Sequence, residues 1–135
     1  MKLVDGCLPM KNNEYIQGEL LRLFREASNK LKGAASLDEA EPAMISFLHE
    51  IKAHVEQRQF IVALFTEELL KAGSAWEVIQ FCLHELRWPE MRHWIHARLT
   101  ESRDIDEATF WRHMLDAFED AWEDAEFYKT YKKRS

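Results

Sequence analysis

Apolar residues recur every three or four positions along most of this chain, and turn-forming residues are scarce. From Asn12 onward, one such series consists of Ile16, Leu20, Leu23, Ala27 and Leu31. Because an α-helix turns once in about 3.6 residues, this spacing places the whole series on one helix face. The 135 residues include only four glycines and three prolines, too few for the many turns of a β-sandwich or barrel. The sequence therefore predicts an all-α fold.

We expect one domain, residues 1–135, because the length suits a single hydrophobic core. Its architecture should be a single-domain bundle of five or six helices, mostly antiparallel with short connections. Residues 1–11 have no apolar period and are expected to be a lead-in segment before the first helix. Residues 129–135 are basic and are expected to form a frayed tail.

Proline and glycine positions predict the ends of the middle helices. A helix is expected from Pro42, because proline suits the first turn of a helix. No other proline or glycine occurs before Gly73. Residues 42–72 can form either one helix or two helices separated near residues 56–59. A further helix should follow Gly73 and stop before Pro89, where the next helix begins.

The last predicted helix opens near Asp104 or Asp106 and extends to Ala125. Its apolar face covers about half of the circumference and allows either an intrachain core or a dimer seam. Between Asp104 and Glu126 the sequence has nine acids and one basic residue, Arg112. Crowded like charges repel along a helix, and a basic protein would relieve this repulsion. We expect a partner to bind the acidic residues Asp116, Glu119, Asp120 and Glu123.

Tryptophan and arginine gather where two helices meet at Pro89. Trp88 and Trp94 lie close in sequence to Arg87 and Arg92. Tryptophan and arginine are enriched in the residues that dominate protein–protein binding energy. We therefore expect this aromatic-rich helix junction to contribute to partner binding.

The same stretch suggests an alternative function as a helical metal-binding enzyme. Glu90, His93 and His96 are spaced by three residues, so that helical neighbours can share zinc or iron. His84 can approach His93 if the chain turns back at Pro89. A di-iron bundle needs a second Glu-x-x-His pair, which the sequence lacks. We therefore expect no cofactor.

The sequence favours a non-enzymatic protein-interaction module, and an inhibitor or immunity-type binder of a basic protein would fit its charge. A helical-repeat-like scaffold is another alternative, because residues 74–99 have the size of one repeat hairpin. The formal net charge of −6 disfavours nucleic-acid binding. No apolar run is long enough to cross a membrane, and the first residues do not resemble a signal peptide, so we expect a cytoplasmic protein.

Overall fold

The computed structural model describes residues 2–33, 37–71, 73 and 75–132, which form an all-α fold. Its helices are α1 (Lys2–Gly33), α2 (Leu37–Ala53), α3 (Arg58–Leu69), α4 (Trp76–Leu86), α5 (Pro89–Thr100), α6 (Ile105–Asp116) and α7 (Lys129–Lys132). Two short 3₁₀ segments, η1 (Val55–Gln57) and η2 (Glu123–Phe127), lie between them. No strand occurs among the described residues, so the all-α prediction is confirmed, with seven α-helices in place of the expected five or six.

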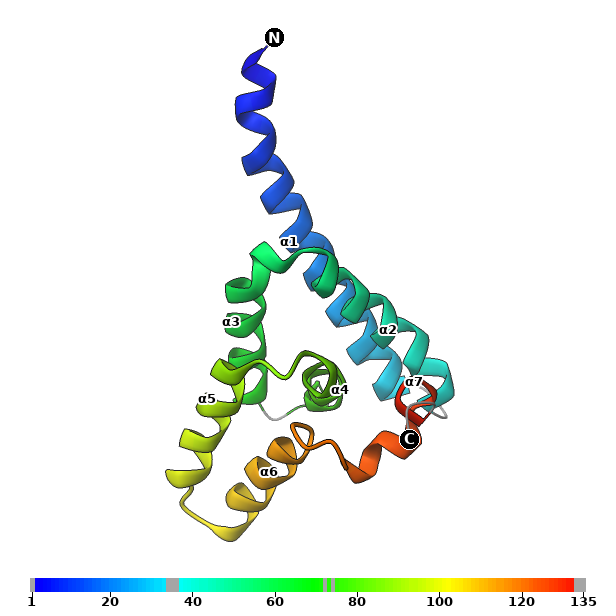
Figure 1. The fold of residues 1–135 in the computed structure, drawn as a ribbon, viewed down its shortest axis with the longest axis vertical. Helices are drawn as coiled ribbons and strands as arrows, with labels where there is room; N and C mark the ends of the chain where they lie inside the picture. The colour runs from blue at the N-terminus through cyan, green and yellow to red at the C-terminus, as the bar shows by residue number, and fades with distance from the viewer. Residues whose placement is uncertain (1, 34–36, 72, 74, 133–135) are drawn as a thin grey trace.

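The helices form two main pairs with α4 between them. Helix α1 packs along α2, and α5 packs on α6 at the other end of the molecule (Figure 1). Helix α4 contacts α1, α2 and α3. The expected repeat hairpin of residues 74–99 is therefore not a packed unit, because α4 and α5 have different principal neighbours. Ser74, the expected start of that hairpin, lies outside the described residues.

One continuous core holds these elements together. Phe24 of α1, Phe47 of α2 and Phe65 of α3 are buried against one another, with ring centroids 5.5 to 6.4 Å apart. Burial of an aromatic side chain contributes about 2–3 kcal/mol to stability. These three rings therefore fasten the first three helices at one point.

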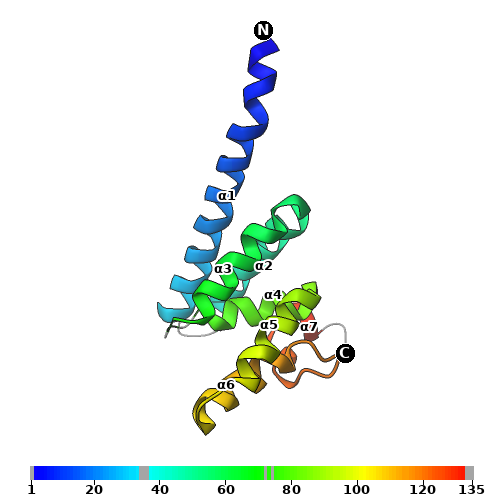
Figure 2. The same ribbon diagram turned by 90° about the vertical axis from the view of Figure 1, so that its left-hand side faces the viewer.

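Helix α1 begins at Lys2, which corrects the expected lead-in of residues 1–11. In both ribbon views its N-terminal part extends beyond the other helices (Figures 1 and 2). Periodicity indicates a helix only where one face is buried, and in both views none of the other described helices lies beside this part. The sequence pattern therefore did not predict it.

Helix α2 begins at Leu37, ahead of the predicted start at Pro42. Pro42 is exposed, so the carbonyl that its missing N–H leaves unpaired can be hydrated. The helix stops where His54 leaves the helical region, with φ −129° and ψ 66°. Residues 42–72 thus form two helices, and η1 makes the turn between them.

The predicted continuous helix from Asp104 to Ala125 is wrong in its second half, because α6 ends at Asp116. The chain turns and continues as η2 and α7. This path buries Trp122, Ala125, Tyr128 and Tyr131, which are spaced by three residues. Within this stretch only Glu123–Phe127 is 3₁₀, while Trp122 and Tyr128 have extended backbone, and this irregular path turns all four side chains toward the core. On a straight α-helix, residues three apart are offset by about 60°, so the four side chains would cover about half of the circumference.

The expected frayed tail of residues 129–135 is wrong for residues 129–132. The carboxylate of Glu41 accepts hydrogen bonds from the backbone N–H groups of Lys129, at 3.0 Å, and of Thr130, at 2.8 Å. The hydroxyl of Tyr131 donates to the carbonyl of Phe81 at 2.5 Å. The segment is therefore docked on α2 and α4, and residues 133–135 lie outside the described part of the chain.

Candidate functional site

Acidic side chains gather around a hollow at the C-terminal end of α6. The hollow has a volume of about 240 Å³. We call it the acidic hollow, and the residues that line it are His113, Asp116, Glu119, Ala121, Trp122, Glu123 and Asp124. Three of the four acidic residues that the sequence predicted for partner binding, Asp116, Glu119 and Glu123, are thus brought together. They lie on a helix end, a turn and η2, and not on one helix face.

Three side chains, two from α4 and one from its C-cap residue, hold the chain that forms this hollow in place. The amide of Gln80 donates to the carbonyl of His113, and Nδ1 of His84 donates to the carbonyl of Ala117, both at 2.7 Å. Arg87 donates to the carbonyl of Phe118 at 3.1 Å. Carbonyls at a helix C-terminus lack partners within the helix and need such donors. These bonds therefore explain why α6 ends here.

Arg87 has the left-handed backbone conformation at the end of α4, with φ 49°. A side chain at this position is strained relative to glycine, which usually occupies it. Besides its bond to Phe118, the guanidinium donates to the carbonyl of His84 at 2.5 Å and pairs with Asp120 at 3.0 Å. Arg87 and Asp120, both expected to bind a partner, are thus engaged with each other within the fold.

Few positive charges compensate the four carboxylates that line the hollow. Among the described residues, Asp116, Glu119 and Glu123 form no side-chain hydrogen bond or ion pair. Asp124 lies 3.5 Å from Nε2 of His113, which compensates its charge only when the imidazole is protonated. The acidic hollow therefore carries a surplus of negative charge.

Glu77 of α4 lies behind this hollow and responds to its charge. Burial raises the pKa of the Glu77 carboxyl, and the negative charge of Asp124 raises it further, while His113 opposes the shift. The raised pKa means that the ionised form of Glu77 is less favourable in the folded protein than in the unfolded chain.

Glu77→Gln is therefore expected to stabilise the protein at neutral pH, by less than about 1 kcal/mol because Glu77 is only half-buried. Protonation of Glu77 favours the folded state. This contribution is complete below the unfolded pKa of about 4.3 and is lost as pH rises through the folded pKa. Urea unfolding at several pH values should show a difference at pH 7 that vanishes below pH 4. A variant that is less stable than the parent protein at pH 7 would contradict this sign.

The four predicted metal ligands are not brought together. Glu90 forms a two-bond ion pair with Arg58, at 2.6 and 2.8 Å, which lowers the pKa of its carboxyl. His84 is buried on Ala117, whereas His93 and His96 are exposed on α5. In the described part of the chain, no three or more His, Cys, Asp or Glu side chains are grouped so that they could hold a metal ion.

The aromatic-rich junction is largely covered. Trp88 is 8% exposed, and the guanidinium of Arg58 lies 4.8 Å from its ring centre. Trp94 is half-buried, and its ring is edge-on to that of Trp111, with 5.7 Å between the ring centres. The guanidinium of Arg98 lies 5.5 Å from the centre of the Trp94 ring. The junction therefore offers a partner little aromatic surface.

A second hollow of about 470 Å³ adjoins the acidic hollow. Its lining consists of Pro89, Arg92, His93, His96, Leu115 and Glu119. Glu119 lines both hollows, so one surface runs from α5 to η2. Arg92, predicted for partner binding, and the exposed His93 and His96 lie on its α5 side.

No family model matches the chain, and no significant match was found among curated proteins or solved structures. None of the described helices has the length and apolar character that crossing a bilayer requires.

Proposed function

We propose that this chain is a non-enzymatic protein-interaction module whose acidic hollow binds a basic segment of another protein. The observation that carries this proposal is the gathering of Asp116, Glu119, Glu123 and Asp124 around one hollow. Three of these carboxylates have no hydrogen-bonded or ion-paired partner among the described side chains. Lysine or arginine side chains of a partner would supply the missing positive charge.

The hollow suits a side chain with a long stem and a charged head. Trp122 and Ala121 contribute apolar surface to its lining, and the carboxylates surround that surface. Lysine and arginine bury their methylene stems on apolar surface while keeping the charged group near anions. An unneutralised acidic surface also accelerates encounter with a basic protein, and salt screens this effect. An inhibitor or immunity-type protein that covers a basic surface belongs to this functional class.

We place this encounter in the cytoplasm. Cys82 is a free thiol that is fully buried in α4. Burial raises the pKa of this thiol and keeps it in its unreactive form. The proposal therefore needs no disulfide and no oxidising compartment.

Fluorescence anisotropy with a labelled peptide of alternating lysine and alanine tests the proposal. We expect saturable binding that weakens with salt, and no binding of a glutamate–alanine peptide. Glu119→Lys/Glu123→Lys should weaken binding by at least ~10-fold, because each reversal removes an attraction and adds a repulsion. The peptide has the basic side chains of the proposed partner, so the test does not require the partner to be identified first.

The matched control is Glu67→Lys/Asp106→Lys, which makes the same change in net charge at exposed acids away from the hollow. This variant should bind the lysine peptide within about twofold of the parent protein, since long-range charge is screened beyond ~10 Å in 0.1 M salt. Equal weakening in both variants would mean that the peptide senses net charge alone. That result would overturn the proposed site.

A further inference from the structure

Positive side chains surround another hollow, which is lined by α1, by the end of α3 and by the residues that lead into α4. The hollow has a volume of about 450 Å³, and its polar lining consists of Arg25, Ser28, Asn29, Lys32, Glu68 and Lys71. Among these described residues, three positive charges stand against one negative charge. The lining therefore has a net charge of +2, whereas the whole chain has a net charge of −6.

Two of the three cations in this lining have no counter-ion in the described part of the chain. Glu68 accepts a hydrogen bond from Nζ of Lys71 at 2.9 Å and so compensates that one charge. Arg25 and Lys32 form no side-chain hydrogen bond or ion pair with a described residue. The hydrogen bond with Glu68 raises the pKa of the Lys71 ammonium, and the positive charge of Arg25 opposes this rise. Arg25 and Lys71 therefore lie close enough to repel each other, and an anion in the hollow would relieve this repulsion.

Ser28 places a hydroxyl without a hydrogen-bond partner in the wall of the same hollow. Its Oγ atom is buried and has no partner in the described structure. A buried hydroxyl that has lost its water and gained no other partner is unfavourable. Rotation about the Cα–Cβ bond of Ser28 would let the hydroxyl donate to an acceptor in the hollow. Helix α4 begins directly after Ala75, which also lines the hollow, and the N–H groups at a helix N-terminus attract anions.

We infer that this hollow binds a phosphate group, carried by a small molecule or by a phosphorylated residue of another protein. A phosphate monoester has about two negative charges at neutral pH and three strongly accepting oxygens, which match the net charge and the donors of the lining. Arginine also binds phosphate with two parallel N–H groups, which Arg25 can supply. A carboxylate, with one charge and two oxygens, would leave part of the positive charge uncompensated.

This site is separate from the acidic hollow, because the two hollows share no lining residue. The inference therefore goes beyond the proposed function and does not depend on it. Glu119→Lys/Glu123→Lys, which should lose the lysine peptide, should bind phosphate as the parent protein does. Each site can thus fail its test without affecting the test of the other.

An NMR titration of the ¹⁵N-labelled full chain with inorganic phosphate tests the inference, with sodium chloride keeping the ionic strength constant. At about pH 8, where phosphate is mainly a dianion, we expect saturable amide shift changes centred on residues 25–32. Arg25→Gln should weaken binding by ~10-fold, because a charge-assisted hydrogen bond is lost. Shift changes that do not saturate, or that are spread over basic residues elsewhere, would overturn the inference.

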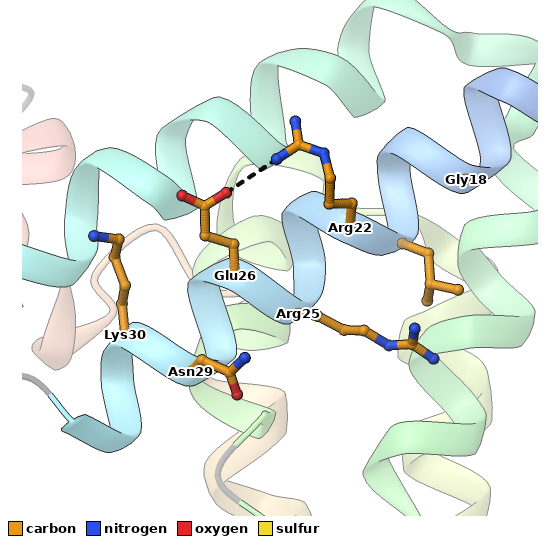
Figure 3. Close-up of a pocket in the computed structure, with 7 residues that line it drawn as sticks. Gly18, Arg22, Arg25, Glu26, Asn29 and Lys30 are labelled. Carbon is orange, nitrogen blue, oxygen red and sulfur yellow. Dashed lines mark hydrogen bonds and ion pairs between the residues drawn. The ribbon is translucent and has the colours of Figure 1, made fainter.

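Arg22→Gln is the matched control, with the same change in charge on the same helix. Figure 3 shows Arg22 joined to Glu26, with Arg25 directed away from both. Because Arg22 is already compensated and does not line this hollow, the variant should bind phosphate within about twofold of the parent protein. Equal weakening in Arg25→Gln and Arg22→Gln would mean that phosphate senses only the net charge of α1, and would overturn the inference.

Ser28→Ala provides a test in which stability and binding respond differently. The variant loses a buried hydroxyl that has no partner and gains a better helix former, so its melting temperature should be no lower than that of the parent protein. It should nevertheless bind phosphate ~3-fold more weakly, because the hydroxyl no longer donates to the ion. Unchanged phosphate binding in this variant would contradict the assigned site.

The source of the phosphate is tested with a short alanine peptide that contains one phosphoserine, beside its unphosphorylated form. Equal affinities for inorganic phosphate and for the phosphopeptide would support a small ligand, and tighter binding of the phosphopeptide would support a phosphorylated protein. Binding of the unphosphorylated peptide at the same residues would overturn the inference, since the phosphate group would then not be what the hollow recognises.

Discussion

Replacing Tyr131 with alanine should lower the free energy of unfolding by about 4 kcal/mol. Tyr131 is 2% exposed, and its ring centre lies 4.6 Å from His84, 5.0 Å from Phe81 and 6.1 Å from Trp122. Truncation would leave a cavity between α4 and the C-terminal segment and would remove the hydrogen bond to Phe81. Urea unfolding monitored by circular dichroism measures the change.

Two controls separate the contributions of Tyr131. Tyr131→Phe removes only the hydroxyl and should cost about 1 kcal/mol. Lys132→Ala alters the exposed neighbour and should cost less than about 0.5 kcal/mol. If Tyr131→Ala unfolds within 1 kcal/mol of the parent protein, the C-terminal segment is not docked as the structure describes.

Glu41→Ala should cost about 3 kcal/mol through a different mechanism. The Glu41 side chain, which is 3% exposed, accepts three hydrogen bonds, one from Lys129 and two from Thr130, the shortest at 2.7 Å from the Thr130 hydroxyl. Alanine would leave the two backbone N–H groups without an acceptor. Glu41→Gln keeps an acceptor oxygen but loses the charge, so its cost should be intermediate.

Glu41 and Tyr131 fasten the same short segment, so their effects should not add. Once either residue has released α7, the second substitution has less left to remove. Urea unfolding of the double variant should therefore give a loss smaller than the sum of the single losses. Strict additivity would mean that the two contacts act on independent parts of the fold.

Most helices could be predicted because their signals are local. The scarcity of glycine and proline and the apolar face of residues 12–33 indicated the fold class, and Pro89 marked the start of α5. The end of α6 could not be predicted in this way. It depends on Gln80, His84 and Arg87, which donate to its C-terminal carbonyls from more than 30 residues away in sequence.

The sequence predicted most of the acidic residues of the candidate site, but not how they are arranged in space. The sequence indicated Asp116, Glu119 and Glu123 by the crowding of like charge, and the structure gathers them at one hollow. Asp124 belongs to the same acidic stretch but was not among the predicted partner-binding residues, and His113, which also lines the hollow, was assigned no role. The expected roles of Arg87 and His84 depended on free side chains, and both are used in bonds that only the tertiary fold creates.

The most direct test of the acidic hollow is an NMR titration of the ¹⁵N-labelled protein with the lysine–alanine peptide. We expect the largest amide shift changes to fall within residues 113–124 and to disappear in Glu119→Lys/Glu123→Lys. Shift changes spread evenly over exposed acids elsewhere, or confined to α1, would contradict this expectation.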